Sequence, residues 1–136
     1  MRKEDCIFCK IANGGIPTKT IYENEEFRVI LDLSPATKGH ALILPKEHYA
    51  SLYEMPDELL AEAFKLAKKM ANLMTEKLEC DGFNLVQNNG ETAGQTVFHF
   101  HIHLIPRYRE DGQKIGWNAT NPSGEELEEI KNRMIG

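Results

Sequence analysis

The chain has 136 residues, of which 41% are hydrophobic and 27% are charged. This length suits one domain with its own core, and the composition is that of a soluble globular protein, which excludes the disordered and fibrous classes. With 16 Lys and Arg against 21 Asp and Glu, the formal net charge is -5, so the sequence predicts no nucleic-acid partner, and any anionic substrate must be held by local groups.

The N-terminal segment MRKEDCIFCKIANGG contains no apolar run long enough for a signal peptide, and no later segment approaches the length of a membrane span. We therefore expect a cytoplasmic protein with no membrane partner. Cys6 and Cys9 form a C-x-x-C pair, which in a reducing compartment indicates metal binding or redox activity rather than a structural disulfide. No thioredoxin-like strand precedes the pair, which disfavours the redox alternative.

The middle of the chain alternates between strand patterns and one helical pattern. Two apolar segments flank a polar turn at residues 23–26, which predicts a β-hairpin, and the apolar segment HALILP ends at Pro45. Between Pro56 and Leu78 apolar residues recur at steps of three and four, which predicts an amphipathic helix. A further strand, FNLVQ, begins at Phe83, and the glycine-containing loop NNGETAG follows it.

The segment QTVFHFHIHLIPRY, residues 95–108, places three of the five histidines, His99, His101 and His103, at every second position. In an extended strand alternate side chains point to opposite faces, so the imidazoles share one face. The other face carries the apolar residues Phe98, Phe100, Ile102 and Leu104. Three histidines at this spacing are rare by chance, which disfavours a polar surface with incidental histidines.

Two functional interpretations of these histidines remain. A single metal bound by all three is disfavoured, because the outer pair on a strand is separated by roughly 13 Å, whereas zinc–nitrogen bonds are about 2.0–2.1 Å. The alternative is acid–base and nucleophilic chemistry, since imidazole titrates near neutral pH and attacks phosphorus. The preceding loop contains Gly90 and Gly94, which allow backbone N–H groups to approach a ligand, and Gln95 and Thr96 add donors. This combination favours chemistry on a phosphoryl group.

A last helix is predicted from Ser123, whose hydroxyl can cap it while Glu126 completes a capping box. The predicted fold is one α+β domain over residues 1–136, an antiparallel sheet of about five strands with one long helix and a C-terminal helix. Residues 1–15 form the cysteine knuckle, residues 20–108 the core, and residues 109–136 the C-terminal tail and helix.

The segment HFHIHLI resembles the alternating signature of the histidine triad (HIT) superfamily. The similarity extends through ILDLSPATKGHALILPKEHY and NNGETAGQTVF and covers most of residues 5–108. The chain is most similar to the Hint-like branch, and its C-x-x-C resembles the zinc knuckle of bacterial members. The resemblance implies a HIT-like fold and a homodimeric hydrolase that cleaves purine nucleoside 5'-phosphoramidates or related nucleotide conjugates at the α-phosphate.

The resemblance also implies catalytic roles. His101 matches the nucleophile that becomes nucleotidylated, and His103 and His40 match its supporting imidazoles. Thr96 and Gln95 match groups that contact the phosphate and the leaving group. Transferases of the superfamily carry Gln where this chain has His103, so a third histidine favours hydrolysis of the intermediate by water.

For nucleotide binding, Asn88 matches a polar residue beside the phosphate and ribose, and the Asp32 carboxylate matches the acceptor of both ribose hydroxyls. The residues that match the base pocket are Ile7, Phe8, Ile11, Leu33 and Leu42. Without the resemblance, Asp32 is equally typical of a loop cap, and the apolar set is typical of plain core.

Some features differ from the Hint-like pattern. Animal Hint proteins carry Ser at the position of Thr96 and end in Trp-Pro-Pro-Gly, which this chain lacks. The segment LIPRY also resembles the dinucleoside polyphosphate hydrolase branch. Two alternatives to a phosphoramidase therefore remain, a dinucleoside polyphosphate hydrolase and a non-catalytic adaptor that binds nucleotide or zinc.

The cysteines and two further histidines make one possible metal set. Cys6 and Cys9 offer two thiolates, and His48 and His99 offer two imidazoles, which together satisfy tetrahedral zinc. The resemblance to zinc-binding bacterial relatives favours a structural zinc here, and we expect catalysis to require no metal. The resemblance further implies a homodimer, with the Pro56–Leu78 helix and the Phe83 strand at its interface.

Overall fold

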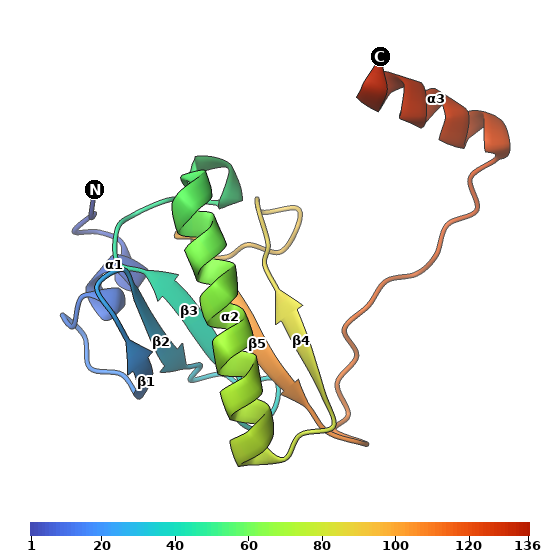
Figure 1. Cartoon of the computed structure of the whole chain (residues 1–136). Coiled ribbons are helices and arrows are strands. Elements are labelled where there is room, and N and C mark those ends of the chain that lie inside the picture. Colours follow the sequence, from blue (N-terminus) through green and yellow to red (C-terminus); the bar gives the residue numbers. More distant parts are fainter.

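Five short apolar segments pair into one antiparallel sheet (Figure 1). The computed structural model describes all residues, 1–136. The strands are β1 (Thr20–Glu23), β2 (Phe27–Leu31), β3 (Ala41–Pro45), β4 (Gly82–Val86) and β5 (Ile102–Arg107). Their order across the sheet is β1-β2-β3-β5-β4, so β1 and β4 are its two edges.

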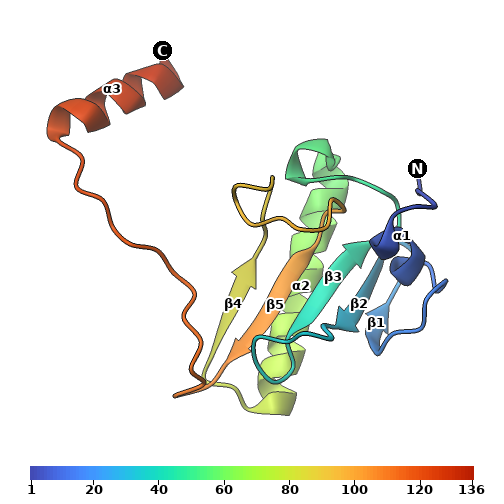
Figure 2. The same ribbon diagram turned by 180° about the vertical axis from the view of Figure 1, so that it is seen from behind.

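Strand β3 lies at the centre of the sheet, and all five of its residues are buried. The long helix α2 (Asp57–Leu78) covers one face, where Met70 and Ala67 share a core with Ile43 and Ile102. On the opposite face the short helix α1 (Ile7–Ala12) lies beside one end of β3 (Figure 2). Most of this second face is left free of helices.

The predicted α+β class, the hairpin, the third and fourth strands and the long helix are all confirmed. Helix α2 begins at Asp57 with Pro56 as its N-cap and ends where Glu79 adopts a positive φ of 53°. The sequence did not predict α1 or the 3-10 turn η1 (Leu52–Glu54), because each is too short to establish a helical period. None of the helices is long and apolar enough to cross a membrane.

The predicted strand, which the alternation starts at Phe98, is wrong in its first part. Strand β5 begins only at Ile102, and residues 97–99 form a bend. The bend arises because Phe100 N–H donates to the carbonyl of Tyr49 at 2.6 Å, outside the sheet. His99 and His101 therefore precede the strand instead of lying within it.

The predicted alternation of core-facing apolar residues with histidines is confirmed only from Phe100 onward. Phe100, Ile102 and Leu104 are fully buried against α2, as expected for the apolar face. Phe98 instead has half of its side chain exposed (50%), because the bend rotates it away from the core.

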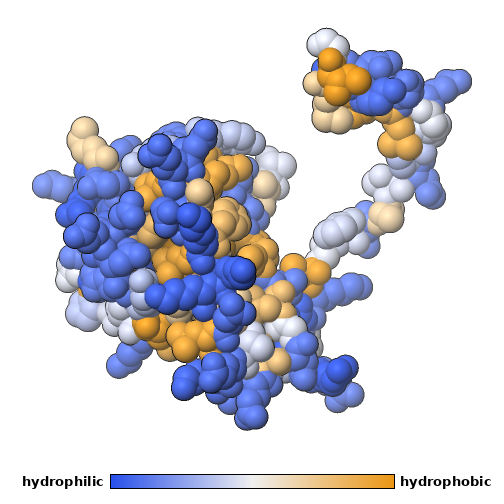
Figure 3. Space-filling view, in the orientation of Figure 1, coloured by the Kyte–Doolittle hydropathy of each residue, from blue (hydrophilic) through white to orange (hydrophobic).

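Residues 112–136 form an extended C-terminal arm, and every one of them is exposed. The arm carries helix α3 (Gly124–Ile135), whose predicted capping box between Ser123 and Glu126 is confirmed. Figures 1 and 2 both show α3 held away from the rest of the chain, on the side of edge strand β4. The apolar residues of α3 therefore remain at the surface (Figure 3).

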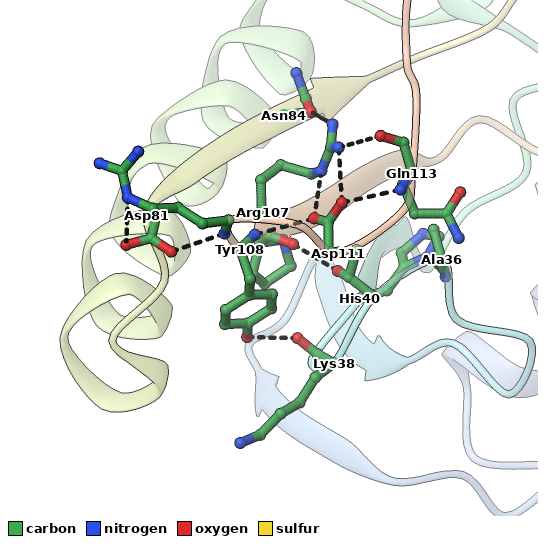
Figure 4. Close-up of polar contacts among 12 residues, drawn as sticks. Ala36, Lys38, His40, Asp81, Asn84, Arg107, Tyr108, Asp111 and Gln113 are labelled. Atoms are coloured by element: carbon green, nitrogen blue, oxygen red, sulfur yellow. Dashed lines mark hydrogen bonds and ion pairs between the residues drawn. The ribbon is translucent and has the colours of Figure 1, made fainter.

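A network of charged and polar groups fixes the point at which the arm leaves the sheet (Figure 4). The Arg107 guanidinium donates two hydrogen bonds to the Asp111 carboxylate, at 2.9 and 3.0 Å, and a third to Asn84 at 2.9 Å. These bonds hold the pKa of Asp111 well below its usual value. Arg107 also donates to the carbonyl of Gln113 at 2.6 Å, so the first residues of the arm have a defined direction.

Candidate active site

The register of the sheet gathers polar residues on the face opposite α2. Leu42 of β3 pairs with Ile30 of β2 on one side and with His103 of β5 on the other. Side chains two residues apart share a face, so Asp32 after β2 and His40 before β3 join this row. The Asp32 N–H donates to the His40 carbonyl at 2.9 Å, which extends the β2–β3 pairing to these two residues.

The imidazole of His101 is held in one tautomer. Its Nδ1 lies 2.7 Å from the carbonyl oxygen of His99, and since a carbonyl can only accept, Nδ1 carries the proton and Nε2 has a free lone pair. Burial lowers the pKa of His101 from its ordinary value, so the ring is neutral near pH 7. A neutral imidazole with a fixed lone pair is suited to nucleophilic attack.

His40 and His103 form a hydrogen-bond chain beside His101. The Ala36 N–H donates to Nδ1 of His40 at 2.9 Å (Figure 4), so His40 carries its proton on Nε2 and donates it to Nδ1 of His103 at 3.0 Å. His103 then has its own proton on Nε2. The carboxylate of Asp32 lies 3.6 Å from His40 Nε2 and orients the chain electrostatically.

The possible metal-ligand atoms of Asp32, His40 and His103 lie within 4.8 Å of one another, close enough to share a metal ion. The protonation pattern argues against that use, because the nitrogen of His40 that faces the other two carries the shared proton. The hydrogen bond from His40 to His103 instead leaves the His103 Nε2–H free to donate to a phosphate oxygen.

A cavity of about 220 Å³ lies beside His101. Four of the five apolar residues predicted for the base pocket line it, and so do the predicted polar residues Asp32, Thr96 and His103. The four are Phe8, Ile11, Leu33 and Leu42. The Phe8 ring meets the His101 ring edge-on, with centroids 5.0 Å apart, so the cavity has an apolar end and a polar end.

The sequence analysis missed four further residues of the cavity wall: Thr18, Ile30, Leu31 and Val97. Ile30 could have been found by extending the alternation back from Asp32 along the same strand. Thr18 and Val97 reach the cavity from irregular segments, for which the sequence carries no periodic signal.

Three residues predicted to bind nucleotide do not line this cavity: Ile7, Asn88 and Gln95. Gln95 is 2% exposed, and its side-chain amide is engaged within the molecule, accepting from Gly90 N–H at 2.9 Å and donating to the carbonyl of Ala50 at 2.6 Å. It therefore shapes the loop before Thr96. Asn88 is half-buried at the base of that loop, and Ile7 lines a neighbouring groove.

The second cluster consists of Cys6, Cys9, His48 and His99, whose donor atoms lie within 4.8 Å of one another. Cys9 Sγ is 3.4 Å from His48 Nδ1 and 3.5 Å from His99 Nδ1. Tetrahedral zinc with its usual bond lengths places sulfur and nitrogen ligands about 3.5 Å apart. His99 Nε2 donates to the carbonyl of Pro45 at 2.8 Å, which leaves Nδ1 free to bind a metal. The donor set fits a closed zinc site.

The buried histidine chain has a pH-dependent contribution to stability. Burial, together with the neighbouring His101 and His40, lowers the pKa of His103 from 6.5 to about 4. As the pH falls from about 6.5 to about 4, the unfolded chain binds a proton that the folded chain does not, so His103 destabilises the fold over this window. We expect His103→Gln to reduce the pH slope of the unfolding free energy, measured by urea titration, by up to about 1.4 kcal/mol per pH unit. Identical slopes for the two proteins would contradict this.

Comparisons with known proteins find relatives that match nearly the whole chain. The family model of the HIT domain matches residues 13–110. The adenosine 5'-monophosphoramidase of Saccharomyces cerevisiae is 40% identical over 131 residues, 96% of this chain and 80% of the relative. A crystal structure of a HIT family member from Bacillus subtilis superposes with a TM-score of 0.88 at 42% identity, covering 96% of this chain and 95% of that one. A zinc-bound histidine triad protein from Mycobacterium smegmatis superposes with a TM-score of 0.76 at 35% identity, over 95% and 97% of the two chains.

Proposed function

This chain belongs to the HIT family, and we propose that it is a nucleotide hydrolase that cleaves purine nucleoside 5'-phosphoramidates or related conjugates at the α-phosphate. The observation that carries the proposal is the fixed lone pair of His101 beside a cavity with an apolar and a polar end. The relative from Saccharomyces cerevisiae, an adenosine 5'-monophosphoramidase, supports the same reaction class.

In the proposed first step, Nε2 of His101 attacks the α-phosphorus, the bond from phosphorus to the leaving amine breaks, and a nucleotidyl-histidine forms. The imidazole gains positive charge as the new bond forms, and the His99 carbonyl that accepts from Nδ1 stabilises that charge. The His103 Nε2–H donates to a non-bridging phosphate oxygen. The amine departs with a proton from solvent on the exposed side of Thr96.

In the second step water attacks phosphorus, the bond to His101 breaks, and the water returns one proton to solvent. The products are the free amine, a nucleoside monophosphate and the original enzyme. The purine lies against Phe8 and Leu42, and the ribose hydroxyls donate to Asp32. Asn88 and Gln95 act indirectly, by shaping the loop that presents Thr96.

A turnover panel tests this assignment. We expect adenosine and guanosine phosphoramidates to be hydrolysed faster than dinucleoside polyphosphates. A preference for dinucleotides would favour the dinucleoside polyphosphate hydrolase alternative, and nucleotide binding without turnover of any substrate would favour an adaptor.

We further propose that Cys6, Cys9, His48 and His99 hold a structural zinc. The measured sulfur–nitrogen spacings and the zinc-bound relative from Mycobacterium smegmatis support this. When bound, zinc would supply folding free energy by fixing α1 to the segment before β5. Its four ligand positions would be filled by protein, so the catalytic steps above use no metal.

The chain is also proposed to form a homodimer across edge strand β4. On the face that α2 covers, Phe64 of α2 is 41% exposed and Leu85 of β4 is 46% exposed. Helix α3 presents Leu127, Ile130 and Met134 at helical spacing with no cover. Because the arm projects on the side of β4, a second copy paired at that edge lies beneath it, and each arm covers its partner.

The dimer has a direct test in solution. We expect light scattering at micromolar concentration to give twice the mass of one chain. The double variant Leu127→Glu, Ile130→Glu should weaken the dimer, because it places charge on the apolar side of α3 that the partner covers. Glu129→Gln on the polar side of α3 is the matched control and should leave the mass unchanged. A monomeric mass for the unaltered protein would reject the proposal.

A further inference from the structure

A second hollow adjoins the candidate active site. It is a groove of about 450 Å³, and it shares two wall residues, Thr96 and Val97, with the cavity beside His101. The groove runs from these residues toward the N-terminal segment, where Ile7, Asp5 and Lys3 line it. Phe98 forms another part of its wall, and Cys6 and His48 of the second cluster also line it.

The groove carries apolar side chains that the fold leaves uncovered. Phe98 is 50% exposed and Ile7 is 52% exposed. The alternation predicted Phe98 in the core, and the family resemblance implied a place for Ile7 in the base pocket. The bend at residues 97–99 separates Phe98 from the core. Apolar surface facing water is stabilised when a ligand covers it, by about 25 cal/mol per Å².

The outer end of the groove carries one charge of each sign. Neither the Lys3 ammonium nor the Asp5 carboxylate forms an ion pair or a side-chain hydrogen bond within the chain. The opposite charges give this end no net sign, so it does not select for a cationic or an anionic ligand. The side chains of Ile7, Val97 and Phe98 offer the groove's apolar contacts to a ligand.

Resting on the proposed function, we infer that this groove binds the leaving group of the substrate, an amine with an aromatic or branched apolar body. An in-line displacement requires the leaving group to depart opposite the attacking nitrogen. The base and ribose occupy the cavity, so a substituent on the leaving nitrogen has to extend beyond it. Thr96 and Val97 form the boundary between the two hollows, and the groove begins on their far side.

Two adenosine 5'-phosphoramidates test the inference, one that releases ammonia and one that releases 2-phenylethylamine. Ammonia leaves the groove empty, whereas the phenylethyl group reaches Phe98. We expect Phe98→Ala to lower kcat/KM about tenfold for the phenylethyl substrate and to leave the ammonia substrate unchanged. Phe98→Leu, which restores apolar surface, should recover most of the loss, and Tyr53→Ala, an exposed aromatic outside the groove, should affect neither substrate.

The decisive quantity is the ratio of the two kcat/KM values in each protein. A ratio that stays constant between the unaltered protein and a Phe98→Ala variant with an unchanged melting temperature overturns the inference. The proposed function has a separate readout, since it fails only if the unaltered protein does not hydrolyse the ammonia substrate. If Phe98→Ala has a lowered melting temperature, the ratio is measured in Ile7→Ala instead. A ratio in Ile7→Ala equal to that of the unaltered protein then overturns the inference.

Discussion

Replacing His101 by glycine is expected to lower the turnover of an adenosine phosphoramidate by roughly 10⁴-fold or more, the scale on which removal of a nucleophile acts. No other imidazole in the chain can substitute for it. His103 Nδ1 accepts from His40, and His99 Nε2 donates to Pro45, so neither presents a free lone pair to the cavity. Steady-state kinetics with enzyme in large excess over any contaminating hydrolase provides the measurement.

The same variant should still bind a nucleoside monophosphate with an affinity close to that of the unaltered protein. The residues expected to hold the base and ribose, including Phe8, Leu42 and Asp32, are unchanged. Added imidazole should restore part of the activity of His101→Gly by occupying the vacated space, and it should not rescue His101→Ala to the same extent. Unchanged turnover in His101→Gly would rule out the covalent mechanism.

The double substitution Cys6→Ser, Cys9→Ser is expected to lower the melting temperature by about 10 °C or more, because a structural zinc contributes several kcal/mol of folding free energy. Metal analysis of the unaltered protein, purified without a metal-affinity tag, should give about one zinc per chain. The matched control is Cys80→Ser, since Cys80 is a free cysteine outside the cluster. Well under one zinc per chain would reject the site.

We expect the same double variant to raise KM more than it lowers kcat. Zinc would hold α1, and with it Phe8 of the base cavity, so metal loss loosens nucleotide binding. The segment that orients His101 has two anchors independent of the cysteines, the bond from His99 Nε2 to Pro45 and the bond from Phe100 N–H to Tyr49. A chelator that abolishes turnover while leaving the fold and nucleotide affinity intact would contradict a purely structural role.

Much of the fold could be predicted because periodicity in the sequence reflects burial. The stripe between Pro56 and Leu78 has the helical period, and ALILP is apolar throughout because every residue of β3 is buried. The alternation of His101 and His103 with Phe100 and Ile102 likewise places the imidazoles opposite the core.

The errors lie where long-range contacts override a local pattern. Alternation alone extends the last strand back to Phe98, but the Phe100 N–H donates to the carbonyl of Tyr49, which is distant in sequence and cannot be identified from the pattern. Gln95 carries polar groups suited to phosphate, yet its amide is engaged by Gly90 and Ala50. Side-chain type predicts which chemistry is possible at a position, whereas packing decides whether the group is free to perform it.

The covalent intermediate on His101 is the central claim, and rapid-quench mass spectrometry tests it most directly. Enzyme is mixed with excess adenosine phosphoramidate, quenched within milliseconds in alkaline denaturant to preserve the phosphorus–nitrogen bond, and digested. We expect the peptide that contains His101 to gain the mass of one adenylyl group, with a rise and decay that match the burst of amine and the later release of adenosine monophosphate. Full turnover with no adduct on that peptide at any time, or an adduct that persists in His101→Gly, would contradict the mechanism.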